Sequence, residues 1–230
     1  MRDVSFRQMS ESRQIGILLA LSGGFMDAYT YTVRGGVFAN AQTGNIVLLG
    51  VRLAEKNWMG ALAYLIPILA FLAGTFIVEF IREQFQRSKI LHWRQICIAV
   101  EIFLLILVAF FPQSMNMEAN VTVSFVCAMQ VQSFRKINGI ICATTMCTGN
   151  LRSGVDLICQ YFRTKDASLR KKGTRYFLID IFFLLGAMLG VLFTDWMKER
   201  SVLLCCGLLL AGFFLMFLQD KPEKGCRKRS

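Results

Sequence analysis

The sequence has little charge and few of the groups on which enzymes usually depend. Charged residues make up 18% of its 230 residues, whereas hydrophobic residues make up 55%. There is one histidine, His92, and neither a Gly-x-Ser-x-Gly nor a His-Glu-x-x-His motif is present. Such a chain is too apolar for one soluble core of ordinary size. We expect a membrane protein without enzymatic activity, metal site or cofactor.

Cys-x-x-Cys spacing is also absent, although the chain contains eight cysteines. Most of them lie in apolar runs, where cysteine usually behaves as a small buried apolar residue. A cleavable signal peptide is not expected either, because the first apolar run is too long and contains Asp27. The first run is therefore interpreted as a retained membrane span.

Six apolar runs approach or exceed the ~20 residues that cross a bilayer as a helix. They are Ile15–Val33, Trp58–Ile81, Trp93–Phe111, Ala119–Phe134, Tyr176–Trp196 and Val202–Leu218. Small residues at Gly186 and Gly190, and at Ala70 and Gly74, predict faces where helices pack closely. The sequence therefore predicts an all-α membrane protein with six transmembrane helices.

Two further segments, Val37–Ala54 and Ile140–Phe162, either cross the membrane or enter it and return. If both are re-entrant or discontinuous, most of the 26 basic residues lie on the cytoplasmic side. The basic residues left outside are Arg34, Arg52, Lys56, Lys198 and Arg200. If both segments cross, the charge bias is weaker. The positive-inside rule therefore favours the re-entrant scheme, with both termini on the cytoplasmic side of the cell membrane.

The two halves of the chain resemble each other. Thr-Gly-Asn occurs at 43–45 and at 148–150, and "YLIPILAFLAG" at 64–74 resembles "YFLIDIFFLLG" at 176–186. Each half holds three spans, an odd number, so two inverted-topology repeats follow. We predict a cytoplasmic N-terminus at 1–13, membrane repeats at 14–112 and 119–218, and a basic cytoplasmic tail at 219–230. The alternative is a coincidental triplet in two unrelated loops.

Both triplets predict breaks in membrane helices. Backbone that leaves helical geometry inside a membrane persists only where it is buried in protein or lines a wet cavity. Thr43 or Asn45, and Thr148 to Asn150, are suited to cap short helices whose positive N-termini point inward. Together with Arg152, these ends predict a site for an anion or for the carboxylate of a zwitterion. The alternative is that the polar residues only hold helices together.

The candidate substrate-binding residues come from both motifs and from the adjoining spans. They are Asp27, Asn40, Gln42, Thr43, Asn45, Gln132, Thr145, Thr148, Asn150 and Arg152. Acidic residues within spans are costly, so Asp27, Asp180 and Glu101 are also candidates for coupling transport to protons or cations. A structural hydrogen bond to a neighbouring helix is the alternative role of Asp27.

On the motifs "GGFMDAY", "QTGN" and "ATTMCTGNLRS", the chain resembles the YoaK family of bacterial integral membrane proteins, a family of unknown function. The resemblance covers roughly residues 16–218. The residues that carry it are Gly24, Asp27, Phe38, Thr43, Gly44 and Asn45, then Gln130, Gln132, Thr144, Thr145, Thr148 and Gly149. It implies a multi-span protein of the bacterial inner or plasma membrane and indicates no substrate.

We therefore expect a transporter-like protein that moves a small solute through a midplane site between the repeats, by rocking one half against the other. A membrane scaffold or sensor is the alternative, and a membrane-embedded enzyme is the less favoured one. The expected partners are the lipid bilayer, anionic lipid at the basic stretches 163–175 and 221–230, and a small molecule or ion. Nucleic acid is not expected as a partner, and the sequence leaves a homo-oligomer open.

Overall fold

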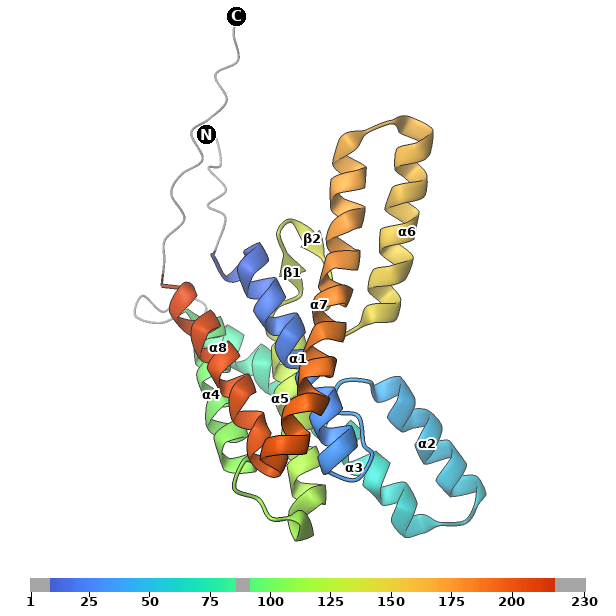
Figure 1. Ribbon diagram of the computed structural model, residues 1–230, viewed down its shortest axis with the longest axis vertical. Coiled ribbons are helices and arrows are strands. Elements are labelled where there is room, and N and C mark those ends of the chain that lie inside the picture. Colours follow the sequence, from blue (N-terminus) through green and yellow to red (C-terminus); the bar gives the residue numbers. More distant parts are fainter. Residues whose placement is uncertain (1–8, 86–91, 218–230) are drawn as a thin grey trace, which may run out of the picture.

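The computed structural model describes residues 9–85 and 92–217, which form an all-α fold with one short hairpin (Figure 1). The helices are α1 (Arg13–Val33), α2 (Gln42–Ala54), α3 (Trp58–Phe85), α4 (Trp93–Val108), α5 (Asn116–Ser133), α6 (Cys147–Thr164), α7 (Ala167–Met197) and α8 (Leu203–Leu215). Short 3-10 helices are η1 (Met9–Glu11), η2 (Gln113–Met115) and η3 (Lys198–Val202), and the antiparallel strands are β1 (Lys136–Ile137) and β2 (Ile140–Ile141). The basic tail predicted at 219–230, and residues 1–8 of the predicted N-terminal segment, lie outside the described residues.

Each of the six apolar runs forms a helix, although several bounds differ from the predicted ones. The largest difference is at α7, which begins at Ala167 and not at Tyr176. The basic stretch 163–175 is therefore mostly helical: it forms the end of α6, a turn with Lys165 at φ +58°, and the first turns of α7. Asp166 starts α7, because its Oδ1 accepts a hydrogen bond from Ser168 N at 2.8 Å.

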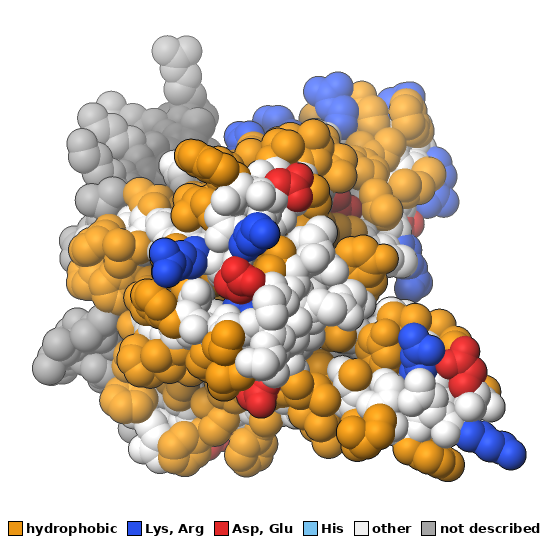
Figure 2. All heavy atoms as spheres, turned by 60° about the horizontal axis from the view of Figure 1, so that its bottom comes forward, with side chains coloured by type: hydrophobic (Ala, Val, Ile, Leu, Met, Phe, Trp, Pro, Cys, Tyr) orange, Lys and Arg blue, Asp and Glu red, His pale blue; other side chains and the backbone are white. Residues whose placement is uncertain are grey.

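Two segments of the described chain are long and apolar enough to cross a membrane. They are Trp58–Phe85, which is α3, and Ala167–Leu215, which contains α7 and α8. Large apolar side chains such as Phe76 and Leu192 are exposed along them. At the lower end of the molecule, Figure 2 shows hydrophobic side chains around the margin, and charged ones near the middle and at the tip of the α2–α3 hairpin. An apolar surface of this extent is typical of a membrane protein.

The helices of the two halves are interleaved. The main neighbour of α1 is α7, and that of α5 is α3, so these long helices pair across the halves. α2 lies against α3 and α6 against α7, whereas α4 and α8 contact each other and pack on α5 and α1 respectively. The halves 14–112 and 119–218 are therefore not separate bodies.

Glycine permits the closest helix crossings. A Cβ atom at Gly186 of α7 would lie 2.1 Å from the carbonyl oxygen of Leu21 in α1. A Cβ atom at Gly74 of α3 would lie 2.6 Å from the carbonyl oxygen of Phe125 in α5. These distances are shorter than any normal van der Waals contact, so the close packing predicted at both glycines is confirmed.

At the lower end, a buried arginine fastens α1 to the α4–α5 pair. Arg34, which follows α1 and was counted among the basic residues of the external side, is fully buried. Its guanidinium donates to Tyr29 Oη at 2.8 Å, to the carbonyl oxygen of Val108 at 3.0 Å and to Asn116 Oδ1 at 3.2 Å. It therefore satisfies a carbonyl at the last turn of α4, where a positive charge is also favoured by the helix dipole.

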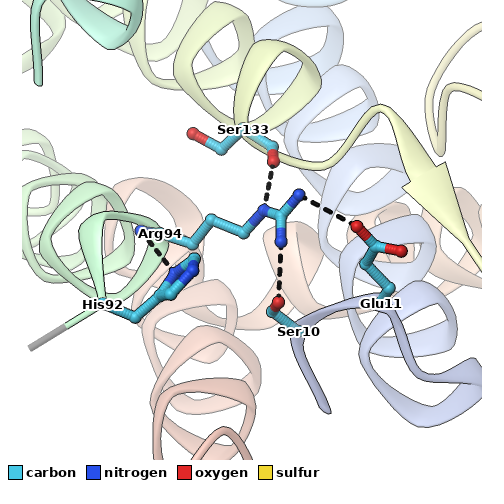
Figure 3. Close-up of polar contacts among 5 residues, drawn as sticks. All are labelled: Ser10, Glu11, His92, Arg94 and Ser133. Carbon is cyan, nitrogen blue, oxygen red and sulfur yellow. Dashed lines mark hydrogen bonds and ion pairs between the residues drawn. The ribbon is translucent and has the colours of Figure 1, made fainter. Parts of the chain in front are cut away.

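At the upper end, Arg94 has the corresponding role (Figure 3). It lies in the first turn of α4, and its guanidinium donates to the carbonyl oxygen of Ser133 at 2.9 Å, at the end of α5. It also donates to Ser10 Oγ at 2.8 Å and to Glu11 Oε1 at 3.2 Å, just before α1. The start of α1, the start of α4 and the end of α5 are thus held together by one side chain.

The single histidine is a helix cap. His92 Nδ1 accepts a hydrogen bond from the backbone N–H of Arg94 at 3.3 Å, and its own backbone N–H donates to Gln95 Oε1 at 3.0 Å. Burial, together with the positive charge of Arg94, lowers the pKa of His92 below its usual value. The side chain therefore has a structural role at the start of α4.

Candidate functional site

Each Thr-Gly-Asn triplet lies inside the first turn of a helix. α2 begins at Gln42 and α6 at Cys147, and the residues before them, Ala41 and Met146, make no side-chain cap. The prediction that the threonines or asparagines of the triplets cap these helices is therefore wrong. Their side chains come too late in the turn to reach the free N–H groups at the helix start.

The two asparagines instead form hydrogen bonds with the backbone of the segment that precedes each helix. Asn45 Nδ2 donates to the carbonyl oxygen of Phe38 at 2.7 Å, and Asn150 Nδ2 donates to that of Ala143 at 2.8 Å. In both cases the acceptor lies seven residues earlier, and both asparagines are buried. Each bond satisfies a carbonyl group in irregular backbone, which inside a membrane would otherwise be costly.

α2 and α6 both begin near mid-height of the molecule and run towards opposite ends (Figure 1). α1 ends and α3 begins at the lower end, whereas the β1–β2 hairpin after α5 points towards the upper end, where α7 begins. The chain after α1 therefore turns back into the molecule before α2 starts, and the chain after α5 does the same before α6. In the second case the turn includes the β1–β2 hairpin, with Asn138 at φ +49° and Gly139 at φ +80°.

A cavity of about 840 Å³ lies where these two segments meet. Its polar lining includes Asp27, Asn40, Gln42 and Thr43 from the first half and Thr145 and Thr148 from the second. Its apolar wall is formed by α3 and α7, with Ile68, Phe71, Phe183 and Val191. Among residues 9–85 and 92–217, the lining holds one carboxylate and neither lysine nor arginine. Six of the predicted site residues are therefore brought together.

Asp27 joins α1 to the chain before α2. The carboxylate is 7% exposed, and its Oδ1 accepts a hydrogen bond from the backbone N–H of Asn40 at 2.7 Å. Asn40 Nδ2 in turn donates to the carbonyl oxygen of Gly23 at 3.1 Å, whereas its Oδ1 has no partner among the described residues. A Cβ atom at Gly23 would lie 2.4 Å from Cγ2 of Thr145. Both motif segments thus pack on the same turn of α1.

A second cavity, of about 300 Å³, adjoins the first. It is lined by Gln132, Asn150 and Tyr176, among others, and it shares Met146 and Gly149 with the large cavity. The first turn of α6 therefore separates the two spaces. Gln132 is held there by a hydrogen bond from its Nε2 to Glu79 Oε1.

Four predicted residues line neither cavity: Asn45, whose bond to Phe38 is described above, and Asp180, Arg152 and Glu101. Asp180 of α7 accepts a hydrogen bond from Asn150 Nδ2 at 2.9 Å, and Arg152 is exposed on α6. Glu101 is fully buried in α4, and neither of its carboxyl oxygens has a partner among the described residues. Arg152 therefore adds no charge to the large cavity. Asp180 links α7 to α6 through its hydrogen bond with Asn150.

The sequence analysis missed Cys147 and Met146, which also line the large cavity. Their position directly before the second triplet was the only available signal, because cysteine and methionine are common in any apolar run. Cys147 is half-buried. Cys97, Cys127, Cys142, Cys205 and Cys206 are buried, as predicted for small apolar residues, whereas Cys159 is exposed.

Comparison with known proteins gives a family without an activity. No curated protein and no solved structure matches the chain. The family described as "Protein of unknown function (DUF1275)" matches residues 15–215, which is consistent with the resemblance to the YoaK family. Since the match covers most of the chain, this protein belongs to the DUF1275 family.

Proposed function

We propose that this protein is a transporter-like membrane protein that passes a small polar solute through the large cavity. The observation that carries the proposal is that Gln42 and Thr43, from the first motif, and Thr148, from the second, line one cavity with Asp27. Polar groups that converge inside an apolar helical protein are costly unless they serve a site or a water-filled path. A scaffold would gain nothing from a cavity of this size.

In the membrane, we place α1, α3, α4, α5, α7 and α8 as six spans, with α2 and α6 as half-length helices. The course of the chain supports this arrangement, because α2 and α6 start near mid-height and run to opposite ends (Figure 1). The basic residues of 163–175 lie at the upper end, which we assign to the cytoplasm by the positive-inside rule. Both termini are then cytoplasmic.

We also propose that the two halves form an inverted repeat. The helix pairs support it: exchanging α1–α4 with α5–α8 in order converts the α1–α7 pair into α5–α3, and α2–α3 into α6–α7. Asn45 and Asn150 make the same contact in each half, and Gly74 and Gly186 occupy equivalent crossings. Because the pairs cross between halves, the bodies that move would be α1–α6–α7 and α2–α3–α5. This replaces the expected rocking of one half against the other.

The charge of the lining favours a cation, or the ammonium group of a zwitterion, over the anion expected from the sequence. The cavity holds the Asp27 carboxylate without a basic side chain. The Asp27 carboxylate already accepts a hydrogen bond from the segment that leads into α2. The Asp180 carboxylate accepts one from Asn150 in the first turn of α6. The positive helix ends therefore have internal carboxylates near them and need no anionic ligand.

Transport is tested by reconstituting the purified protein in liposomes. We expect uptake of at least one member of a panel of monovalent inorganic cations, primary amines and amino acids, compared with a panel of anions. Protein-free liposomes and heat-inactivated protein are the controls. If folded protein moves only anions, the assigned charge preference fails. If it moves no solute of either panel, with or without a pH gradient, the scaffold interpretation gains support.

Cys147 allows a direct test of whether the cavity is wet. In a variant that keeps Cys147 as its sole cysteine, we expect a charged, water-soluble thiol reagent to label the folded protein in liposomes, because this residue lines the cavity. The matched control keeps only Cys127, which is fully buried, and we expect it to remain unlabelled until the protein is unfolded. Equal protection of both thiols would mean that the cavity is dry.

A further inference from the structure

A second polar pocket lies at the upper end of the molecule, away from the cavity of the proposed function. Its volume is about 300 Å³, and it is formed by the start of α1, the β1–β2 turn and the first turns of α7. Four of its lining residues are basic: Arg13, Arg170, Lys171 and Arg175. The other lining residues are Asn138, Thr174 and Leu178, so no carboxylate of the described residues lines the pocket. Its charge is therefore strongly positive.

The basic side chains come from different elements and are partly fixed in place. Arg175 Nη1 donates to the carbonyl oxygen of Asn138 at 2.7 Å, which ties α7 to the hairpin turn. The Arg170 guanidinium lies 5.4 Å from the ring centroid of Tyr161 in α6. Within the described residues, none of the four forms an ion pair, and the nearby Glu11 carboxylate is taken by Arg94. Their charges are thus available to a ligand.

The pocket continues inward into an apolar crevice of only about 20 Å³, which is room for about one water molecule and not for an acyl chain. Arg13, Asn138, Arg175 and Leu178 line both spaces, and the crevice adds Ile17, Ile137, Ile140 and Ile179. A cluster of cations directly above apolar side chains suits an amphiphile with a negatively charged head. Arginine and lysine together suit phosphate oxygens, since guanidinium groups bind them in pairs of hydrogen bonds and lysine adds a point charge.

We propose that this pocket binds a phosphate group, and that its source is the head of an anionic phospholipid in the cytoplasmic leaflet. The proposal does not depend on transport: it rests on the position of the four cations and on the assignment of this end of the molecule to the cytoplasmic leaflet. A soluble phosphate compound would share the recognition of the head but would gain nothing from the surrounding bilayer, into which the acyl chains of a lipid extend. The two sources can therefore be separated by experiment.

The test uses the full-length protein in detergent and native mass spectrometry with phosphatidylglycerol and, in parallel, phosphatidylcholine. We expect selective retention of phosphatidylglycerol, weakened about 10- to 30-fold in the double variant Arg170→Gln/Lys171→Gln, since each surface cation contributes about 1 kcal/mol of attraction. The matched control Arg163→Gln/Lys172→Gln removes the same charge from residues outside the pocket lining. We expect it to change retention less than about 3-fold.

Arg13→Gln is a second variant on the opposite wall of the pocket, and we expect it to weaken retention about 5-fold. Calorimetric titration with inorganic phosphate and pyrophosphate distinguishes the sources. One outcome would keep the phosphate site and reject the lipid. In that outcome the protein binds pyrophosphate, the double variant Arg170→Gln/Lys171→Gln does not, and no lipid is retained selectively. Equal losses in the pocket and control double variants, or no loss in either, would overturn the proposal.

Discussion

Asp27→Asn is expected to slow solute uptake by the reconstituted protein severely. In the described part of the chain, this carboxylate is the one charged group that lines the cavity, and loss of one partner of a buried charge pair costs about 2–5 kcal/mol. That cost corresponds to an initial rate that is lower by at least about 30-fold at low solute concentration. The amide retains the acceptor oxygen that faces the backbone N–H of Asn40, so the segment before α2 should keep its position. Initial uptake rates in liposomes measure the effect.

The control for this variant is Asp195→Asn, which removes the same charge from an exposed position on α7 outside the cavity. It should leave uptake unchanged. Arg152→Gln separates the two assignments of charge, since the sequence predicted Arg152 as part of an anion site, whereas the structure places it away from the cavity. Normal uptake by Asp27→Asn, or loss of uptake by Arg152→Gln, would contradict the proposed site.

Gly186→Ala is expected to destabilise the protein by about 3 kcal/mol, at the upper end of the usual cost of overpacking. The added methyl group would meet the carbonyl oxygen of Leu21 at 2.1 Å, and a backbone atom cannot move aside as a side chain can. Gly24 lies at the same crossing, where a Cβ atom would be 1.9 Å from the carbonyl oxygen of Phe183. We expect a lower unfolding temperature in detergent and a smaller monodisperse fraction after purification.

Gly207→Ala in α8 is the matched control, because nothing lies within 4 Å of the added Cβ. The substitution should be neutral or slightly stabilising, since alanine is the better helix former. Gly74→Ala tests the equivalent crossing between α3 and α5, with a contact of 2.6 Å to Phe125, and should destabilise less than Gly186→Ala. If Gly186→Ala unfolds at the same temperature as Gly207→Ala, the close α1–α7 crossing is wrong.

Hydropathy was sufficient to predict the helices of the six apolar runs, because each run is much longer than an ordinary β-strand. It placed α4 at Trp93 and α3 at Trp58 without error at the first residue. It failed at α7, whose first turns are basic and carry no hydropathy signal. The β1–β2 hairpin was also missed, although Asn138 and Gly139 are a familiar turn pair, because each strand has only two residues.

The sequence predicted which residues form the candidate site better than it predicted the charge of the ligand or the hydrogen bonds within the site. Matching triplets indicated that both segments are irregular, and most of the cavity's polar residues follow from that. The sequence could not show that Asn45 and Asn150 bond backward to the preceding chain, because that depends on where each helix starts. Nor could it show that Arg34 is buried, since a basic residue at a span end is usually in water.

The pairing of α1 with α7 also bears on how the protein is made. During synthesis the first span enters the membrane long before its partner exists, since α7 begins only at Ala167. Until then, the face of α1 around Gly24 lacks the helix against which it packs. Assembly must therefore wait for nearly the whole polypeptide, so a ribosome that stalls after α5 would leave a product that the cell's quality control should remove.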